Sequence, residues 1–120
     1  MNTKIYHLEN CGTCKKAAAW LAKRGIDAQF IPIKQKTPSV AELQKAYEQY
    51  QGWSRIFNTS GMEYRARKLS EKLPSMTDKE ILNLLQQNGM LIKRPFLVTD
   101  NGIAAGFKEA EWEKIFSHAK

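Results

Sequence analysis

The spacing of apolar positions changes several times along the chain, and each change predicts a new element. Residues 3–7 form a short run typical of a strand. From Cys14 to Leu21 apolar residues recur at helical spacing, and Gly25 is placed to end that helix. Ala28 to Ile33 predicts a second strand, in which a proline at position 32 indicates a sheet edge or a strand end.

The middle of the chain has mainly helical spacing. Ser39 suits the N-cap of a helix that ends at Gly52. Its apolar positions are Val40, Leu43, Tyr47 and Tyr50. Residues 53–57 predict a short helix and 62–69 a second one, separated by turn residues. Thr77 and Glu80 match a capping box before a helix that ends at 88–89. The positions expected to be buried in that helix are Ile81, Leu82, Leu84 and Leu85.

The last part of the chain predicts a hairpin and a helix. Residues 96–98 and 103–105 flank an Asp-Asn-Gly turn, and residues 109–118 keep helical spacing through Trp112, Ile115 and Phe116. The order is therefore βαβ, a helical block, and ββα. This order predicts an α/β, thioredoxin-like fold in a single domain over residues 1–120, with a helical insertion at about 39–90.

Composition is that of a globular protein. The 120 residues are 42% hydrophobic and 26% charged. This length and apolar content allow one hydrophobic core without stabilising disulfides or metal ions. No apolar run approaches the roughly 18 residues of a membrane span, and the chain opens directly into its first strand. We therefore expect a cytoplasmic protein with no membrane contact.

A net charge of +7 raises the question of nucleic acid, but the basic residues are scattered. The densest pieces, residues 65–68 and 93–94, are short. A solvated surface explains most of this charge, with an anionic ligand or an acidic protein partner as the alternative. We expect no direct nucleic-acid binding.

The two cysteines are the strongest chemical signal. Cys11 and Cys14 are three residues apart between the first strand and the first helix, a spacing that closes too short a loop to stabilise the fold. A sulfur at a helix N-terminus faces free backbone N–H groups, and Lys15 adds positive charge, so thiolate is favoured. A dithiol–disulfide couple is the main interpretation. A metal site or idle thiols are the alternatives, although only His7 and His118 remain to complete a zinc site.

Several motifs together resemble the arsenate reductase (ArsC)/Spx family. They are His7-x3-Cys11-Gly12-Thr13, Phe57-Asn58, Leu91-Ile-Lys-Arg94-Pro95 with Val98, and Gly106-Phe107. The resemblance covers about residues 3–116. It implies that Cys11 is the nucleophile, that Arg94 lies near it and stabilises anionic sulfur or substrate, and that Pro95 is a cis proline.

Supporting positions have two interpretations each. His7 is a proton carrier or a packing residue at the strand end, and Arg94 serves the sulfur or forms a structural ion pair. Gly12, Thr13 and Lys15 complete the expected loop.

The chain also departs from the arsenate reductases. Cys14 and Lys15 stand where that branch has serine and arginine, and Phe107 stands where it has its last active-site arginine. Fewer planar bidentate donors would hold a tetrahedral oxyanion less well. We therefore expect arsenate reduction to be weak or absent.

Two functions follow from the resemblance and the cysteine pair. The first is a thiol-disulfide oxidoreductase in which Cys11 attacks and Cys14 resolves the adduct. It needs no bound cofactor, and an external thiol of the glutathione/glutaredoxin or thioredoxin type resets it. The second is a redox-switched regulator resembling Spx, for which RNA polymerase is the implied partner. A monomer is expected in either case.

Overall fold

A four-stranded mixed sheet forms the centre of the computed structural model, which describes residues 2–117. The strands are β1 (Thr3–His7), β2 (Gln29–Pro32), β3 (Phe96–Thr99) and β4 (Gly102–Ala105), in the order β2-β1-β3-β4. β2 runs parallel to β1, whereas β3 is antiparallel to both β1 and β4. The α/β thioredoxin-like prediction is confirmed, including an edge position for the strand that contains Pro32.

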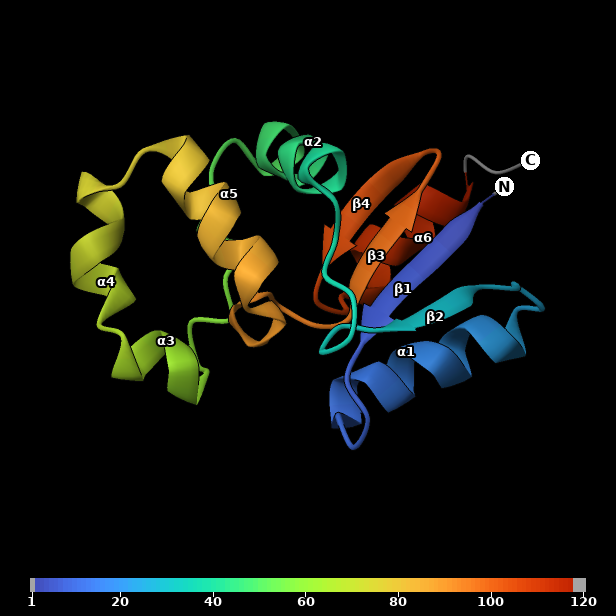
Figure 1. The fold of residues 1–120 in the computed structure, drawn as a ribbon. Helices are drawn as coiled ribbons and strands as arrows, with labels where there is room; N and C mark the ends of the chain where they lie inside the picture. Colours follow the sequence, from blue (N-terminus) through green and yellow to red (C-terminus); the bar gives the residue numbers. More distant parts are fainter. Residues whose placement is uncertain (1, 118–120) are drawn as a thin grey trace.

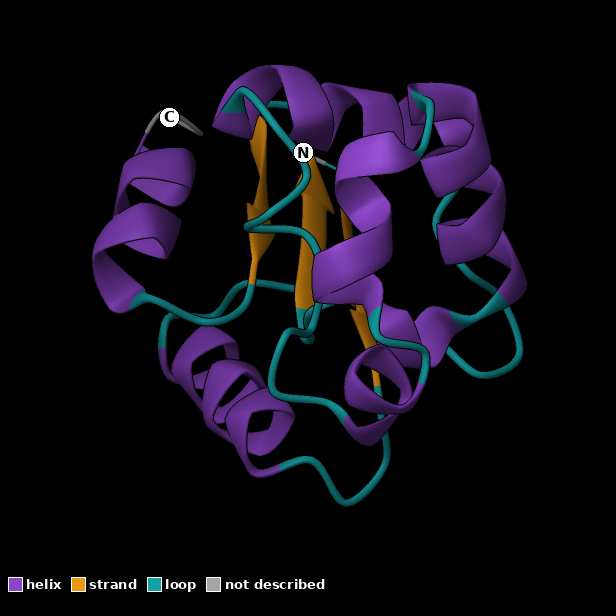
Figure 2. Ribbon diagram, turned by 90° about the vertical axis from the view of Figure 1, so that its left-hand side faces the viewer, coloured by secondary structure: helices purple, strands orange, loops and turns teal. Residues whose placement is uncertain are grey.

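Helices cover both faces of the sheet (Figures 1 and 2). α1 (Gly12–Lys23) and α6 (Glu109–Ser117) pack on one face, where Ile5, Leu97 and Trp112 belong to one buried cluster. The chain between β2 and β3 forms α2 (Val40–Tyr50), α3 (Met62–Ala66), α4 (Leu69–Lys72) and α5 (Asp78–Gln87). This segment also contains the 3-10 turns η1 (Leu73–Ser75) and η2 (Gly89–Leu91).

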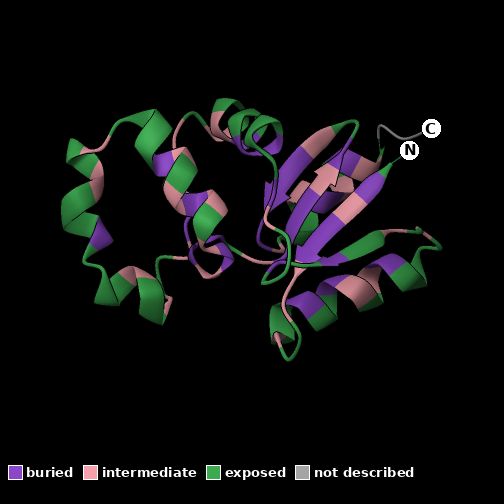
Figure 3. Ribbon diagram, in the orientation of Figure 1, coloured by how far each residue is buried: buried purple, intermediate pink, exposed green. Residues whose placement is uncertain are grey.

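This helical block packs on the other face of the sheet through a second buried cluster. Tyr6, Phe96 and Ile103 of the sheet join Leu43 of α2 and Leu85 of α5 in it. Figure 3 shows burial concentrated in the strands and on the inward sides of the helices, while α3 and α4 are mostly exposed. The block is therefore attached to the sheet mainly through α2, and α5 packs against α2.

Local sequence signals explain most element boundaries. Ser39 caps α2 and Thr77 caps α5, and both form complete capping boxes with a glutamate three residues later. α1 has its buried stripe at Cys14, Ala17 and Leu21, as its spacing predicts. These signals depend only on residues that are near one another in sequence, so the boundaries that they set need no tertiary contacts.

Tertiary contacts override three local predictions. Residues 53–57 form a single turn instead of a helix, because Phe57 pairs with Ile92 in an isolated antiparallel bridge and Lys93 N–H donates to the Ile56 carbonyl at 2.8 Å. The predicted helix over 62–69 is split at Lys68, whose φ of 53° is left-handed. Leu69, just beyond the break, is 3% exposed, so the break accompanies its burial.

The third correction concerns amphipathic faces. Val40 lies at the start of α2 but is 41% exposed, and Leu82 and Leu84 are only partly buried on α5. Ile81 and Leu85 bear the buried contacts of that helix. Residue 118, the last position of the predicted C-terminal helix, lies outside the described residues.

The sheet's β4 edge is closed by side chains of α2. Gln49 accepts the Ile103 N–H at 2.9 Å and donates its amide to the carbonyl of the same residue, as a neighbouring strand would. Tyr50 accepts the Ala105 N–H at 2.9 Å. These bonds fix the helical block to the sheet and remove one edge from pairing with another chain.

Candidate functional site

The carboxyl end of β1 is where the predicted site residues meet. β1 ends at His7 and leads through residues 8–11 into α1. β3 is antiparallel to β1 and starts at Phe96, so the preceding Arg94 and Pro95 lie at this same end of the sheet. Gly106 follows β4 and donates its N–H to the Pro95 carbonyl at 2.9 Å. The fold thus brings together two segments about 80 residues apart in sequence.

Cys11 is the N-cap residue of α1. Its Sγ accepts the backbone N–H of Cys14 at 3.3 Å, in the position that an Asp or Ser oxygen fills in other helices. The side chain is half-buried and the thiol is free. A free helix N–H and the positive end of the helix dipole both stabilise a negative charge on this sulfur.

Cys14 lies one turn into α1 and is only 5% exposed. Burial and a side-chain hydrogen bond with Cys11 are the main causes that raise the pKa of Cys14 to about 11. A hydrogen bond from the Leu8 backbone and the positive charge of Arg94 oppose the rise. Cys14 is therefore a neutral thiol at physiological pH.

Arg94 is held in place by backbone carbonyls. Its Nη1 donates to the carbonyls of Met90 and Ile92, both at 3.1 Å, while its Nε is buried and has no hydrogen-bond partner among the described residues. The guanidinium is close enough for its charge to lower the pKa of Cys14. Among the described residues Arg94 forms no ion pair; its guanidinium braces the chain before β3 through these two backbone carbonyls, and its action on the sulfur stays a prediction. The bond to Pro95 is cis, as the family resemblance implied.

The remaining predicted positions occupy the first turn and the strand end. Gly12 and Thr13 are exposed at the start of α1, and a Cβ on Gly12 would meet nothing within 4 Å. Lys15 is exposed beside Cys14. His7 packs edge-to-face on Phe30 of β2 at 5.5 Å between ring centroids, which favours a packing role for this histidine.

Sequence reasoning missed a hollow of about 330 Å³ beside Cys14. His7, Ala18 and Phe30 contribute to its walls, and Lys15 lies at its rim. Phe30 lies two residues before the proline that indicates a sheet edge, but the hollow forms only where β2 meets α1 in the fold, so no local pattern in the sequence predicts it.

Phe107 packs instead of facing a ligand. Its ring lies 4.9 Å from that of Trp112 and 6.0 Å from that of Trp20. The resemblance to the arsenate reductases implies an active-site arginine at this position, and this chain has an aromatic residue there. The helix α1 is anchored here by aromatic contacts, and no anion-binding donor is supplied.

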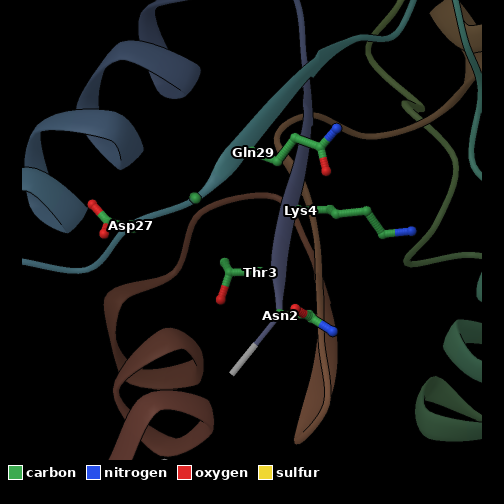
Figure 4. Close-up of a pocket in the computed structure, with 6 residues that line it drawn as sticks. Asn2, Thr3, Lys4, Asp27 and Gln29 are labelled. Carbon is green, nitrogen blue, oxygen red and sulfur yellow. The ribbon is translucent and has the colours of Figure 1, made fainter.

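Other parts of the molecule offer weaker candidates. A polar hollow of about 490 Å³ lies at the opposite end of β1, between Asn2, Lys4 and Asp27 (Figure 4). Lys4 is already paired with Glu42 of α2, so its charge is compensated. Within residues 2–117, no three His, Cys, Asp or Glu side chains gather in a way that could hold a metal ion. The helices of this same range lack the length and apolar character needed to span a membrane.

Several proteins are similar to this chain in sequence or in structure. The chain is 42% identical over 115 residues to the uncharacterized protein YusI of Bacillus subtilis, covering 95% of this chain and 98% of that protein. A crystal structure of an ArsC family related protein from Bacteroides fragilis superposes with a TM-score of 0.86 at 41% identity, covering 96% of this chain and 98% of the other.

A more distant relative carries a regulatory name. The global transcriptional regulator Spx of Listeria innocua is 26% identical over 108 residues, covering 89% of this chain and 81% of that protein. The profile of the ArsC family matches residues 6–115, nearly the whole described fold. With that match and close relatives of the same length, the chain belongs to the ArsC family.

Proposed function

We propose that the protein is a cytoplasmic thiol-disulfide oxidoreductase in which Cys11 is the nucleophile and Cys14 the resolving thiol. The observation that carries this proposal is the contrast between the two sulfurs. Cys11 Sγ is half-exposed and accepts a helix N-terminal N–H, whereas Cys14 is buried with a pKa raised to about 11, mainly by burial. A pair of this kind has one accessible thiol that can act as the nucleophile and one buried thiol that stays protonated until the mixed disulfide has formed.

The first step is attack on an oxidised sulfur of the substrate. The Cys11 thiolate attacks one sulfur of a substrate disulfide, R–S–S–R′, and forms a Cys11–S–S–R mixed disulfide while R′S⁻ leaves. Arg94, fixed by two carbonyl groups, supplies a positive charge beside the developing anions. Its unpartnered Nε–H is a further donor available to such an anion.

The second step uses Cys14. Formation of the adduct removes the charge and the hydrogen bond by which Cys11 raises the pKa of Cys14, leaving burial as the main cause of the shift. Cys14 then loses its proton more readily, and its thiolate attacks Cys11 Sγ and displaces RS⁻. The substrate gains two electrons, and the protein holds a Cys11–Cys14 disulfide.

An external thiol system must return the pair to its reduced form. Two thiols of the glutathione/glutaredoxin or thioredoxin type give up two electrons and close their own disulfide, which restores both cysteines. The mechanism uses no bound cofactor, and we propose that the protein acts as a monomer.

A redox-switched regulator is the second candidate. It is favoured by the similarity to Spx along most of the chain and by the pair of cysteines three residues apart. In this role the same disulfide would change the affinity of the protein for RNA polymerase instead of serving turnover.

One pair of assays separates the two functions. Steady-state reduction of a small disulfide, measured with wild type and Cys11→Ser in the presence of a thiol donor, tests the oxidoreductase. Thiol-dependent turnover that disappears in Cys11→Ser supports it. No turnover, together with polymerase subunits that bind only the oxidised or only the reduced protein, would replace it with the regulator.

A further inference from the structure

The hollow beside Cys14 has apolar walls, which the chemistry of the two cysteines does not by itself require. It lies between the β1–α1 loop, the first turns of α1 and the edge strand β2. Ala18 and Phe30 give it apolar walls, and Cys14 forms part of the same lining. Any group seated here would be in contact with Cys14, three residues from Cys11.

Phe30 is the feature of this hollow that most needs an explanation. It is 42% exposed and is one of three large hydrophobic side chains exposed among the described residues, with Val40 and Met62. The ring packs against His7, which holds it at the mouth of the hollow. A fixed aromatic wall at the edge of an apolar hollow is suited to an apolar side chain.

The end of the sheet that contains the hollow is basic, whereas the lining itself holds one lysine, Lys15, and one glutamate, Glu9. The loops at this end of the sheet and the first turn of α1 carry an excess of positive charge, with Glu9 and Glu109 as the acidic residues. The basic residues are Lys15, Lys16, Lys34, Lys36, Lys93, Arg94 and Lys108. All but Arg94 are exposed. Charge complementarity therefore favours an acidic partner.

The neighbouring sheet edge is free for an approaching chain. Gln49 and Tyr50 occupy the backbone groups of β4, but no described side chain hydrogen-bonds to the backbone of β2. The ladder continues from His7 O to Ile33 N, so by alternation the N–H and carbonyl of Phe30 point away from β1. An extended segment passing Phe30 could thus reach both its backbone and its ring.

We propose that the hollow receives a bulky apolar side chain that lies next to the reacting cysteine of an acidic polypeptide, the dithiol that reduces the Cys11–Cys14 disulfide. This proposal rests on the oxidoreductase function above. The partner's thiolate attacks Cys11 Sγ and releases the Cys14 thiolate, which takes up a proton. The partner's second thiolate then breaks the mixed disulfide, leaving reduced Cys11 and a disulfide in the partner.

Synthetic dithiol peptides test the preference directly. The first peptide has leucine beside its reactive cysteine and acidic flanks, the second replaces the leucine with glycine, and the third keeps leucine but has lysine flanks. Each is mixed with the oxidised protein, and the second-order rate constant for reduction is measured. Dithiothreitol is measured with every protein as the reference reductant.

The acidic leucine peptide is expected to react about tenfold faster than the glycine peptide, which corresponds to partial burial of one leucine. The lysine-flanked peptide is expected to be slower, with a difference that shrinks at high salt. Phe30→Ser should abolish the leucine preference. Val40→Ser, which removes an equally exposed apolar side chain from α2, should keep it.

Other outcomes have distinct meanings. Equal rates for leucine and glycine peptides, or a preference that survives in Phe30→Ser, would overturn the hollow as a binding site while dithiothreitol still reduces the disulfide. A leucine preference without a charge preference would overturn the acidic partner. Failure of the protein to form any Cys11–Cys14 disulfide would overturn both this proposal and the oxidoreductase function.

Discussion

At the scale of single residues, the two sulfurs have different surroundings although they are only three positions apart. Cys11 occupies a cap position at the surface, and Cys14 is turned into the protein by the helical periodicity that also buries Ala17 and Leu21. The sequence predicts this arrangement, because the cap and the stripe are both local patterns. The pairing of Arg94 with backbone carbonyls could not be predicted, since it depends on how the chain before β3 turns.

The resolving step should accelerate with pH. Burial remains the main cause that raises the pKa of Cys14 above its usual value in the Cys11 adduct, where the hydrogen bond and charge of Cys11 no longer act, so its thiolate is a small fraction at neutral pH. That fraction grows about tenfold per pH unit below the pKa. Stopped-flow measurement of RS⁻ release from the Cys11 adduct should show a rate that climbs from about pH 6 to about pH 9. A flat profile over this range would contradict a buried, protonated Cys14.

Arg94 should affect the cysteine pair through its charge and should also stabilise the chain before β3 through its hydrogen bonds. Burial raises the pKa of Cys14, and the Arg94 charge opposes that rise, so Arg94→Ala should raise the pKa of Cys14 further and slow resolution. The carbonyls of Met90 and Ile92 would also lose a donor, at a cost of about 1–3 kcal/mol in stability. Arg94→Lys keeps the charge and should retain most of the effect on Cys14.

The same pH profile and a thermal unfolding curve distinguish the two roles of Arg94. If both variants lower the unfolding temperature but leave the Cys14 titration at its wild-type position, Arg94 is structural and has no place in the site.

At the scale of elements, one buried carboxylate fastens α2 to the sheet. Glu42 belongs to the α2 capping box, accepts a hydrogen bond from Tyr6 at 2.7 Å and pairs with Lys4. Burial by itself would raise the pKa of Glu42, but Lys4, Tyr6 and the Ser39 N–H together hold it below its usual value. The capping box was predictable from Ser39 and Glu42, whereas the use of the same carboxylate by β1 was not.

This carboxylate should make part of the stability depend on acid pH. Since the folded pKa is below the unfolded value of about 4.3, the stabilisation is complete above that value and is lost as pH falls through the folded pKa. Glu42→Gln should lower the free energy of unfolding by about 2 kcal/mol at pH 7 and flatten the acid dependence.

Glu48→Gln, on an exposed position of α2, is the matched control for denaturant titrations across the acid range. A Glu42→Gln protein with the same acid dependence as Glu48→Gln would show that the network around Glu42 contributes nothing.

At the scale of the whole molecule, the fold follows from patterns of apolar residues, and the errors lie in the helical block. The βαβ and ββα halves have short apolar runs, a helix with a regular buried stripe and a turn, so each half is specified locally. Residues 53–57 and 62–69 depend on partners distant in sequence, such as Ile92 for Phe57. The apolar hollow depends on the meeting of β2 with α1, which no local pattern specifies.

The whole site should also be poor at arsenate reduction. Phe107 packs among Trp20 and Trp112, and Lys15 is an exposed point charge, so the planar donors suited to a tetrahedral oxyanion are lacking at both positions. Turnover of arsenate with glutathione or thioredoxin as donor should stay below the order of 1 s⁻¹. A faster rate would restore arsenate as the substrate.

The order of attack by the two cysteines is the central claim, and trapping the mixed disulfide tests it most directly. Reduced wild type, Cys14→Ser and Cys11→Ser are each mixed with one equivalent of a small disulfide and analysed by non-reducing mass spectrometry. Cys14→Ser should accumulate the substrate adduct on Cys11, wild type should carry an intramolecular disulfide, and Cys11→Ser should stay unmodified. An adduct that forms on Cys14 in the Cys11→Ser protein as fast as on Cys11 in Cys14→Ser would contradict the account.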